Sequence, residues 1–126
     1  MKKHIAGEDY LKTIYILQKQ IDRVRSIDVA NYLGFSRPSV SNAVSVLQDA
    51  GLLQMNNDFS LSLTEKGEKI AVEVYERNCF FKKLLMSSGV DEETAAKEAC
   101  NIEHAISEDS FLKLKKKVDS LPFIDI

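Results

Sequence analysis

Three side chains with metal-binding chemistry follow one another in the last third of the chain. Cys100, Glu103 and His104 stand at positions i, i+3 and i+4, and in a helix this spacing puts all three on one face. A thiolate, a carboxylate and an imidazole together suit Fe(II), Co(II), Ni(II) or Zn(II) better than Mg(II) or Ca(II). The spacing alone is also typical of a buried cysteine beside a surface Glu–His pair, because free cysteine is commonly a small core residue.

The rest of the sequence offers little other reactive chemistry. Its two cysteines, Cys79 and Cys100, are too few for a disulfide framework and are expected to be free thiols or ligands. There is no Ser/His/Asp arrangement, glycine-rich phosphate loop or Cys-x-x-Cys pair, so we do not expect an enzyme. There is also no apolar run of about 18 residues and no signal-peptide core, so we expect a cytoplasmic protein.

A second group of polar side chains surrounds Pro38, which fits the first turn of a helix capped by Ser36. The inward positions of this helix are apolar, namely Val40, Ala43, Val44, Val46 and Leu47. The outward positions carry hydroxyls, an amide and a guanidinium, namely Arg37, Ser39, Ser41, Asn42 and Ser45. In the major groove, asparagine pairs with adenine and arginine with guanine or phosphate. Such a face is also typical of a solvated helix, so the interpretation depends on the neighbouring elements.

Those neighbours predict a helix-turn-helix. Periodicity and end signals predict further helices at residues 8–19, 26–33, 64–87, 91–105 and 108–118. Ser26 is the expected N-cap of the second helix, and Gly34 is expected to end it. Thr64 and Asp91 are the expected caps of later helices. The helix after Gly34 would then be the one that enters the major groove.

A hairpin is predicted directly after that helix. Two short apolar runs, 52–54 and 59–63, flank Asn56-Asn57-Asp58, whose residue types favour a tight turn. In the second run Phe59 starts an alternation of apolar and serine residues. The chain is therefore expected to be mainly α, with an N-terminal winged helix-turn-helix, a small β-hairpin wing and further helices. Its charge adds little, since the net value is −2, with +2 in residues 1–50 and −4 in the rest.

Together these segments make the chain resemble the diphtheria-toxin-repressor family of metal-dependent regulators, including its manganese-transport-regulator branch. The resemblance is carried by residues 8–15, 36–41, 63–67 and above all 98–104, which read Glu-Ala-Cys-Asn-Ile-Glu-His. It covers nearly the whole chain. It implies a winged-helix DNA-binding domain at residues 1–70 and a helical metal-binding and dimerisation domain at residues 71–126.

The resemblance also implies site residues. The implied metal ligands are Asp9, Cys100, Glu103 and His104. The implied DNA-binding residues are Ser36, Arg37, Pro38, Ser39 and Asn42. We also expect DNA contacts from Ser41 on the same helix face, from Asn57 at the tip of the hairpin and from Arg25. Asp9 has the form of the manganese-responsive branch and Cys100 that of the iron-responsive branch. The implied cofactor is therefore Fe(II) or Mn(II), with Co(II), Ni(II) or Zn(II) binding in vitro.

Several positions depart from the family pattern. Lys12 replaces a second carboxylate ligand, Asn78 replaces a histidine of an additional metal site, and Lys82 and Ala96 replace other ligands of that site. We therefore expect one metal per subunit. Longer members of the family continue into an SH3-like domain, which we expect this chain to lack.

The resulting prediction is a homodimeric repressor that binds a palindromic operator when it carries metal, and so controls metal homeostasis. Two alternatives stay open at this point. One is a winged-helix regulator that senses an oxidant or a small molecule through Cys100. The other is a protein–protein adaptor that uses the winged fold without DNA.

Overall fold

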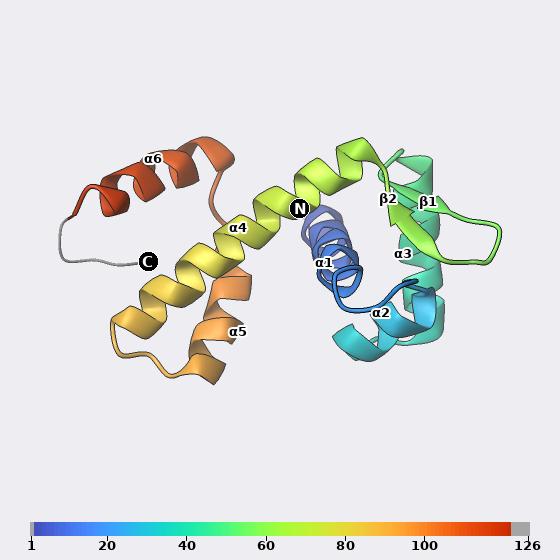
Figure 1. The fold of residues 1–126 in the computed structure, drawn as a ribbon, viewed down its shortest axis with the longest axis horizontal. Helices are drawn as coiled ribbons and strands as arrows, with labels where there is room; N and C mark the ends of the chain where they lie inside the picture. The colour runs from blue at the N-terminus through green and yellow to red at the C-terminus, as the bar shows by residue number, and fades with distance from the viewer. Residues whose placement is uncertain (1, 122–126) are drawn as a thin grey trace. The chain divides into compact units, whose positions relative to one another are not determined.

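The structure is a computed structural model that describes residues 2–121, with side chains described from residue 7 onward. The chain divides into two compact units, Met1–Val72 and Glu73–Ile126. In the described residues the helices and strands, in chain order, are α1 (Lys2–Leu17), α2 (Ser26–Leu33), α3 (Arg37–Asp49), β1 (Leu53–Met55), β2 (Leu61–Leu63), α4 (Glu65–Ser87), α5 (Glu92–Ile102) and α6 (Glu108–Asp119) (Figure 1). This is the expected mainly α fold with one small hairpin.

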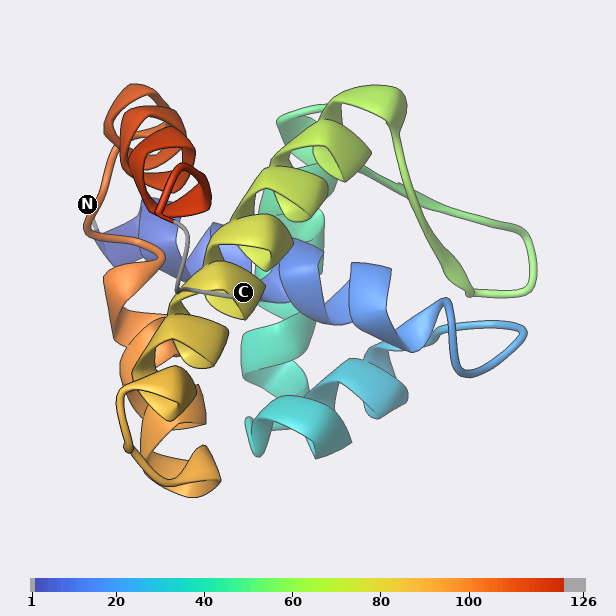
Figure 2. The same ribbon diagram turned by 60° about the vertical axis from the view of Figure 1, so that its left-hand side comes forward.

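The first unit contains the predicted helix-turn-helix. Helix α2 ends at Gly34, whose φ of 71° is left-handed and lets the chain turn sharply. Helix α3 then starts behind Ser36, whose hydroxyl accepts a hydrogen bond from the Ser39 amide, with Pro38 in the first turn. Helices α1, α2 and α3 pack beside one another (Figure 2). Their buried side chains belong to one apolar core. The local signals at both ends of the turn therefore set its geometry.

One predicted N-cap and one predicted helix start are wrong. Helix α2 spans the predicted residues, but its N-cap is Arg25 and not Ser26, since the Arg25 amide donates to Oδ2 of Asp28 at 2.8 Å. Helix α1 starts at Lys2, although the apolar periodicity only begins near residue 8. Helical backbone can extend beyond the stripe that packs on the core, so periodicity marks the packed part of a helix better than its end.

The hairpin pairs β1 with β2 in antiparallel register, Leu53 opposite Leu63. Phe59 lies outside the strand, so the prediction that it starts the second strand is wrong. Its φ is 67°, and its amide donates to the Asn56 carbonyl at 3.0 Å, which closes the turn one residue later than the alternation suggested. Its ring is 71% exposed. A bulky residue in left-handed backbone is uncommon, and here it presents an aromatic ring to solvent.

The core of the first unit combines all its elements. Its most buried members are Leu11, Ile14, Val29, Val40 and Ala71. The stripe predicted for α3 is confirmed at Val40, Val44 and Leu47 but is wrong at Val46, which is 63% exposed. Successive helical residues are about 100° apart, so Val46 falls off the stripe that Val40, Val44 and Leu47 define.

Helix α4 is held closely against the turn that precedes β1. Thr64 caps the helix as predicted, since its hydroxyl accepts from the Gly67 amide and donates to the Gly51 carbonyl. A Cβ added at Gly67 would lie 2.0 Å from the Leu52 carbonyl oxygen. Only glycine fits this close approach. The helix ends at Ser87, where the sequence predicted it to end.

The second unit has its own aromatic core. The rings of Phe80, Phe81 and Phe111 pack with centroids 5.2 to 6.0 Å apart, and Ala99 and Val118 complete the cluster. Helix α5, capped by Asp91 as predicted, runs beside the last turns of α4 (Figures 1 and 2). In the part of the chain that the structure describes, no helix is long and apolar enough to cross a membrane.

Candidate DNA-binding and metal-binding sites

Helix α3 presents a polar face of short side chains. The residues predicted to bind DNA from this region are all exposed, namely Ser36, Arg37, Pro38, Ser39, Ser41 and Asn42. Ser45 and Val46 extend the same exposed surface. Because most of these side chains are small, another backbone can approach the helix closely, while Arg37 and Asn42 can reach further. The face therefore has the shape and chemistry of a helix that reads a groove.

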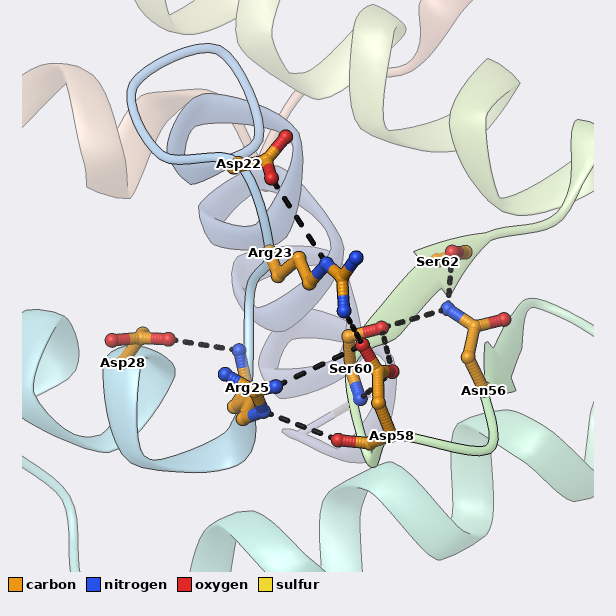
Figure 3. Close-up of polar contacts among 8 residues, drawn as sticks. All are labelled: Asp22, Arg23, Arg25, Asp28, Asn56, Asp58, Ser60 and Ser62. Atoms are coloured by element: carbon orange, nitrogen blue, oxygen red, sulfur yellow. Dashed lines mark hydrogen bonds and ion pairs between the residues drawn. The ribbon is translucent and has the colours of Figure 1, made fainter.

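The hairpin is joined to the α1–α2 loop by ion pairs (Figure 3). Nη1 of Arg23 lies 2.6 Å from Oδ2 of Asp58, and Nε of Arg25 donates to the Asp58 carbonyl at 3.2 Å. The amide and hydroxyl of Ser60 also donate to Asp58, at 3.0 and 2.6 Å. These hydrogen bonds from Ser60, followed by Arg23, lower the pKa of Asp58 to about 2. Asp58 is therefore charged at neutral pH and connects both arginines to the turn.

Backbone and amide hydrogen bonds add to the ion pairs between the hairpin and the α1–α2 loop. The Leu61 amide donates to the Val24 carbonyl at 2.7 Å, so the loop runs alongside β2. Nδ2 of Asn56 donates to the hydroxyls of Ser60 and Ser62, at 3.0 and 2.9 Å (Figure 3). Sequence reasoning treated Asp58 as a turn residue only and did not single out Arg23. Asn57, a predicted DNA contact, lies exposed in the turn.

The predicted metal ligands divide between the units. Asp9 lies on α1 in the first unit, where Nζ of Lys12 is 3.8 Å from its Oδ1. Cys100, Glu103 and His104 lie in the second unit. Lys12, which stands in place of a carboxylate, thus carries a positive charge one helical turn from Asp9 and takes part in an ion pair with it.

The expectation that Cys100, Glu103 and His104 share one helix is wrong in part. Helix α5 ends at Ile102, with Glu103 as its C-cap and His104 in the following turn. The backbone of Glu103 is still right-handed helical, at φ −58° and ψ −27°, so the helical path continues to it. The helix stops because Ser107 caps α6 only a few residues later, and the chain must turn between them.

Two contacts involve the proposed ligands of the second unit. Nε2 of His104 lies 3.3 Å from Oε2 of Glu103, so an imidazole and a carboxylate are already close together. Cys100 is exposed in the last turn of α5, and Nδ2 of Asn78 donates to its Sγ at 3.6 Å. Asn78, expected to replace a metal-binding histidine, therefore contacts Cys100. A carboxylate, an imidazole and a thiol in one short segment are a donor set that fits a first-row divalent ion.

One residue near these ligands was missed by sequence reasoning. Arg77 of α4 is only 6% exposed. Its Nε donates to the main-chain carbonyl of Glu103, and its Nη1 donates to Oε1 of Glu108, both at 2.8 Å. The sequence did contain a signal for this residue, because Arg77 follows Val74 by three positions and precedes Phe81 by four, the spacing of the apolar stripe of α4.

The helix-turn-helix and hairpin define the first unit as a winged-helix DNA-binding domain. Residues 6–60 match the family model described as the N-terminal DNA-binding domain of iron-dependent repressors, and residues 64–123 match that described as their metal-binding and dimerisation domain. The chain belongs to the iron-dependent repressor family. Members of this family are metal-responsive transcriptional regulators that bind DNA and dimerise.

Curated relatives agree with this assignment. The chain is 33% identical, over 86% of its length and 88% of the relative, to an HTH-type transcriptional regulator of Methanocaldococcus jannaschii. It is 34% identical to the transcriptional regulator MntR of Escherichia coli O157:H7, over 82% of the chain and 66% of MntR. It is 36% identical to the iron-dependent repressor IdeR of Mycobacterium tuberculosis, over 90% of the chain and 50% of IdeR.

Solved structures show the same fold. A manganese-dependent transcriptional repressor in complex with manganese superposes with a TM-score of 0.78 at 26% identity, over 88% of this chain and 51% of that one. The manganese regulator SloR gives a TM-score of 0.72 at 28% identity, over 85% and 53%. The chain therefore spans about half the length of several of its relatives. None of these comparisons supports a thiol sensor that acts through Cys100.

Proposed function

We propose that this chain is a repressor that binds a palindromic DNA operator as a homodimer when loaded with Fe(II) or Mn(II), and that it controls metal homeostasis. The observation that carries the proposal is the exposed polar face of α3, beside a hairpin, in a chain of the iron-dependent repressor family. In a symmetric dimer two such faces would read the two halves of a palindrome.

The DNA contacts proposed for the first unit divide by chemistry. Asn42 suits a bidentate contact with adenine, and Arg37 suits guanine or a phosphate. The small residues Ser36, Pro38, Ser39 and Ser41 would let the start of α3 approach the backbone closely. Arg25 and Asn57 would contact phosphates from the loop and the hairpin, and Asp58 would hold Arg25 in place through its carbonyl.

The proposed metal ligands are Asp9, Cys100, Glu103 and His104, with one ion per subunit. A bound divalent ion would supply positive charge that two carboxylates and a thiolate share. Asp9 belongs to the first unit and the other three ligands to the second. Ligation by all four residues would limit the arrangements that the two units sample, and so favour those that present α3 correctly.

The central test is metal-dependent DNA binding. A duplex is first selected from a random library with Mn(II)-loaded protein, and its affinity is then measured anaerobically by fluorescence anisotropy with Fe(II), Mn(II), Co(II), Zn(II) or chelator. We expect metal to tighten binding about 10- to 100-fold. Equal affinities with metal and with chelator would contradict the proposal.

Matched substitutions test the two sites separately. Cys100→Ala and Glu103→Ala should weaken the response to metal, while Cys79→Ala, the other cysteine, should leave it unchanged. Asn42→Ala should weaken DNA binding at every metal concentration, while Gln48→Ala, at the end of the same helix, should not. A wild-type response in both Cys100→Ala and Glu103→Ala would show that the ligand set is wrong.

A further inference from the structure

Arg77 connects helix α4 to two segments of the second unit that lie 26 and 31 residues further along the chain. It projects from α4, donates to the carbonyl of Glu103 at the end of α5, and donates to the carboxylate of Glu108 in the first turn of α6. Both distances are 2.8 Å, and the guanidinium is almost fully buried. These are charge-assisted hydrogen bonds with well-defined direction.

The hydrogen bond from Arg77 to the Glu103 carbonyl takes the place of a main-chain hydrogen bond that a continuing helix would have supplied. In a continuing helix the amide of residue 107 would donate to the carbonyl of residue 103. Here α5 has ended, and Ser107 caps the next helix. The positive charge of Arg77 lies at the C-terminal end of α5, where exposed carbonyls favour a cation. The Arg77 side chain therefore fixes the position at which the chain leaves α5.

The segment fixed in this way carries two of the proposed metal ligands. Arg77 bonds Glu103 through the main-chain carbonyl, so this bond holds the backbone of Glu103 and does not involve its carboxylate. His104 is the next residue, and its imidazole already lies 3.3 Å from the Glu103 carboxylate. Cys100 differs, because it lies within α5 and the hydrogen bonds of that helix hold its backbone.

We propose that Arg77 is a positioning residue that orients Glu103 and His104 for metal binding, by holding the Glu103 carbonyl, and that Glu108 holds Arg77 in turn. The inference rests on the proposed ligand set. It extends that set by a residue that would touch no metal. Residues of this kind affect metal affinity because ligands that are already oriented lose less freedom on binding.

The test uses Co(II) as a spectroscopic probe of the whole chain. Wild type should show a thiolate-to-Co(II) absorption band, and Cys100→Ala should lose it. Arg77→Gln should keep the band, because Cys100 still binds, but should bind Co(II) about 10- to 100-fold more weakly. Its ligand-field bands should change, because Glu103 and His104 are less well ordered. Lys83→Gln, which removes an exposed cation from the same helix, should match wild type.

A second measurement needs no metal. In metal-free Arg77→Gln, backbone amides of residues 103–107 should become more mobile by NMR relaxation, while those of residues 92–100 stay rigid. Arg77→Lys keeps the charge but not the fork of donors, so it should rescue the affinity only in part. Glu108→Gln leaves Arg77 in place and should weaken Co(II) binding by a smaller factor in the same direction.

The outcomes separate the two proposals. If wild type shows no thiolate band, or Cys100→Ala keeps it, the ligand set itself is wrong. If wild type behaves as expected but the Arg77 and Glu108 variants bind Co(II) with wild-type affinity and spectrum, Arg77 has only a structural role and the inference is overturned. If Arg77→Gln does not fold, Arg77→Lys and Glu108→Gln decide in the same way.

Discussion

In both units, arginine side chains hold together segments that connect helices and strands, but the arginines are exposed in the first unit and buried in the second. In the first unit, Arg23 and Arg25 pair with Asp58, and their side chains are 60% and 46% exposed. In the second, the Arg77 side chain is 7% exposed and its donors reach a carbonyl and Glu108. Exposed ion pairs contribute at most about 1 kcal/mol, whereas a buried hydrogen-bonded charge leaves costly unpaired groups when it is broken. The two units therefore differ in what happens when the arginine is lost. At the exposed ion pairs water can hydrate the remaining groups, whereas a buried partner is left without a donor.

The largest expected effect lies in the first unit but involves neither arginine. Gly67→Ala puts a Cβ 2.0 Å from the Leu52 carbonyl oxygen, so the backbone of either α4 or the turn before β1 must move. We expect the free energy of unfolding to fall by about 4 kcal/mol or more. Chemical denaturation measures it. Gly7→Ala is the control, because its added Cβ would meet only Leu47 at 3.6 Å, an ordinary contact.

Arg77→Met is expected to have the next largest effect. The Glu103 carbonyl loses a buried donor, while Glu108 can turn to solvent, so the second unit should lose about 2 kcal/mol. Denaturation monitored by NMR signals of Phe111 measures this change within the second unit. Because Glu108 can turn to solvent, the double variant Arg77→Met/Glu108→Leu should be about as stable as the single variant. A clear recovery of stability in the double variant would show instead that the unpaired carboxylate of Glu108 stays buried.

Arg23→Met applies the same substitution to the exposed ion pairs that connect the α1–α2 loop to Asp58 of the hairpin. Arg25 still donates to Asp58, and both groups remain hydrated, so the expected loss is under about 1 kcal/mol. The comparison between the units is sharpest when both arginine variants are measured at low and high salt. Salt should reduce the effect of Arg23→Met but leave that of Arg77→Met. An equal loss of stability in the two variants would contradict the expected difference between the exposed and the buried arginine.

The smallest expected effect concerns pH. The pKa of Asp58 is lowered from 3.8 to about 2, mainly by hydrogen bonds from Ser60, so the folded state prefers the charged carboxylate. Its contribution to stability is therefore complete above about pH 4 and is lost as the pH falls through about 2. NMR titration of the Asp58 carboxyl carbon measures this pKa directly. Ser60→Ala should move the pKa up toward 3.8, and a titration that does not change would contradict the assignment of Ser60 as the main cause.

Local signals account for the part of the fold that the sequence predicted. Ser36, Thr64 and Asp91 each cap the helix that follows them, and the groups they accept from lie three residues away. Gly34 ends α2 because its left-handed backbone is a property of the residue itself. Phe59 departs from the prediction, because alternation of apolar and polar residues does not reveal a left-handed φ.

The candidate sites were predicted less completely because they depend on distant partners. Arg23 and Asp58 are 35 residues apart, and Arg77 and Glu103 are 26 apart, so no local spacing indicates either pair. The metal ligands in the second unit came from residue types and the family resemblance, while the end of α5 at Ile102 was not foreseen. The arginine within the apolar stripe of α4 was visible in the sequence, but its partners were not.

The apolar clusters of the two units have consequences for unfolding. The cluster around Val40 and the cluster around Phe111 have no described residue in common, although α4 contributes to both. Cooperative melting depends on a shared core, so the units are expected to open with separate free energies. Amide hydrogen exchange along α4 should then change in rate between Ala71 and Val74, within one uninterrupted helix. The two parts of this helix would then have different opening free energies. Metal added to the protein should slow amide exchange most in the part that exchanges faster.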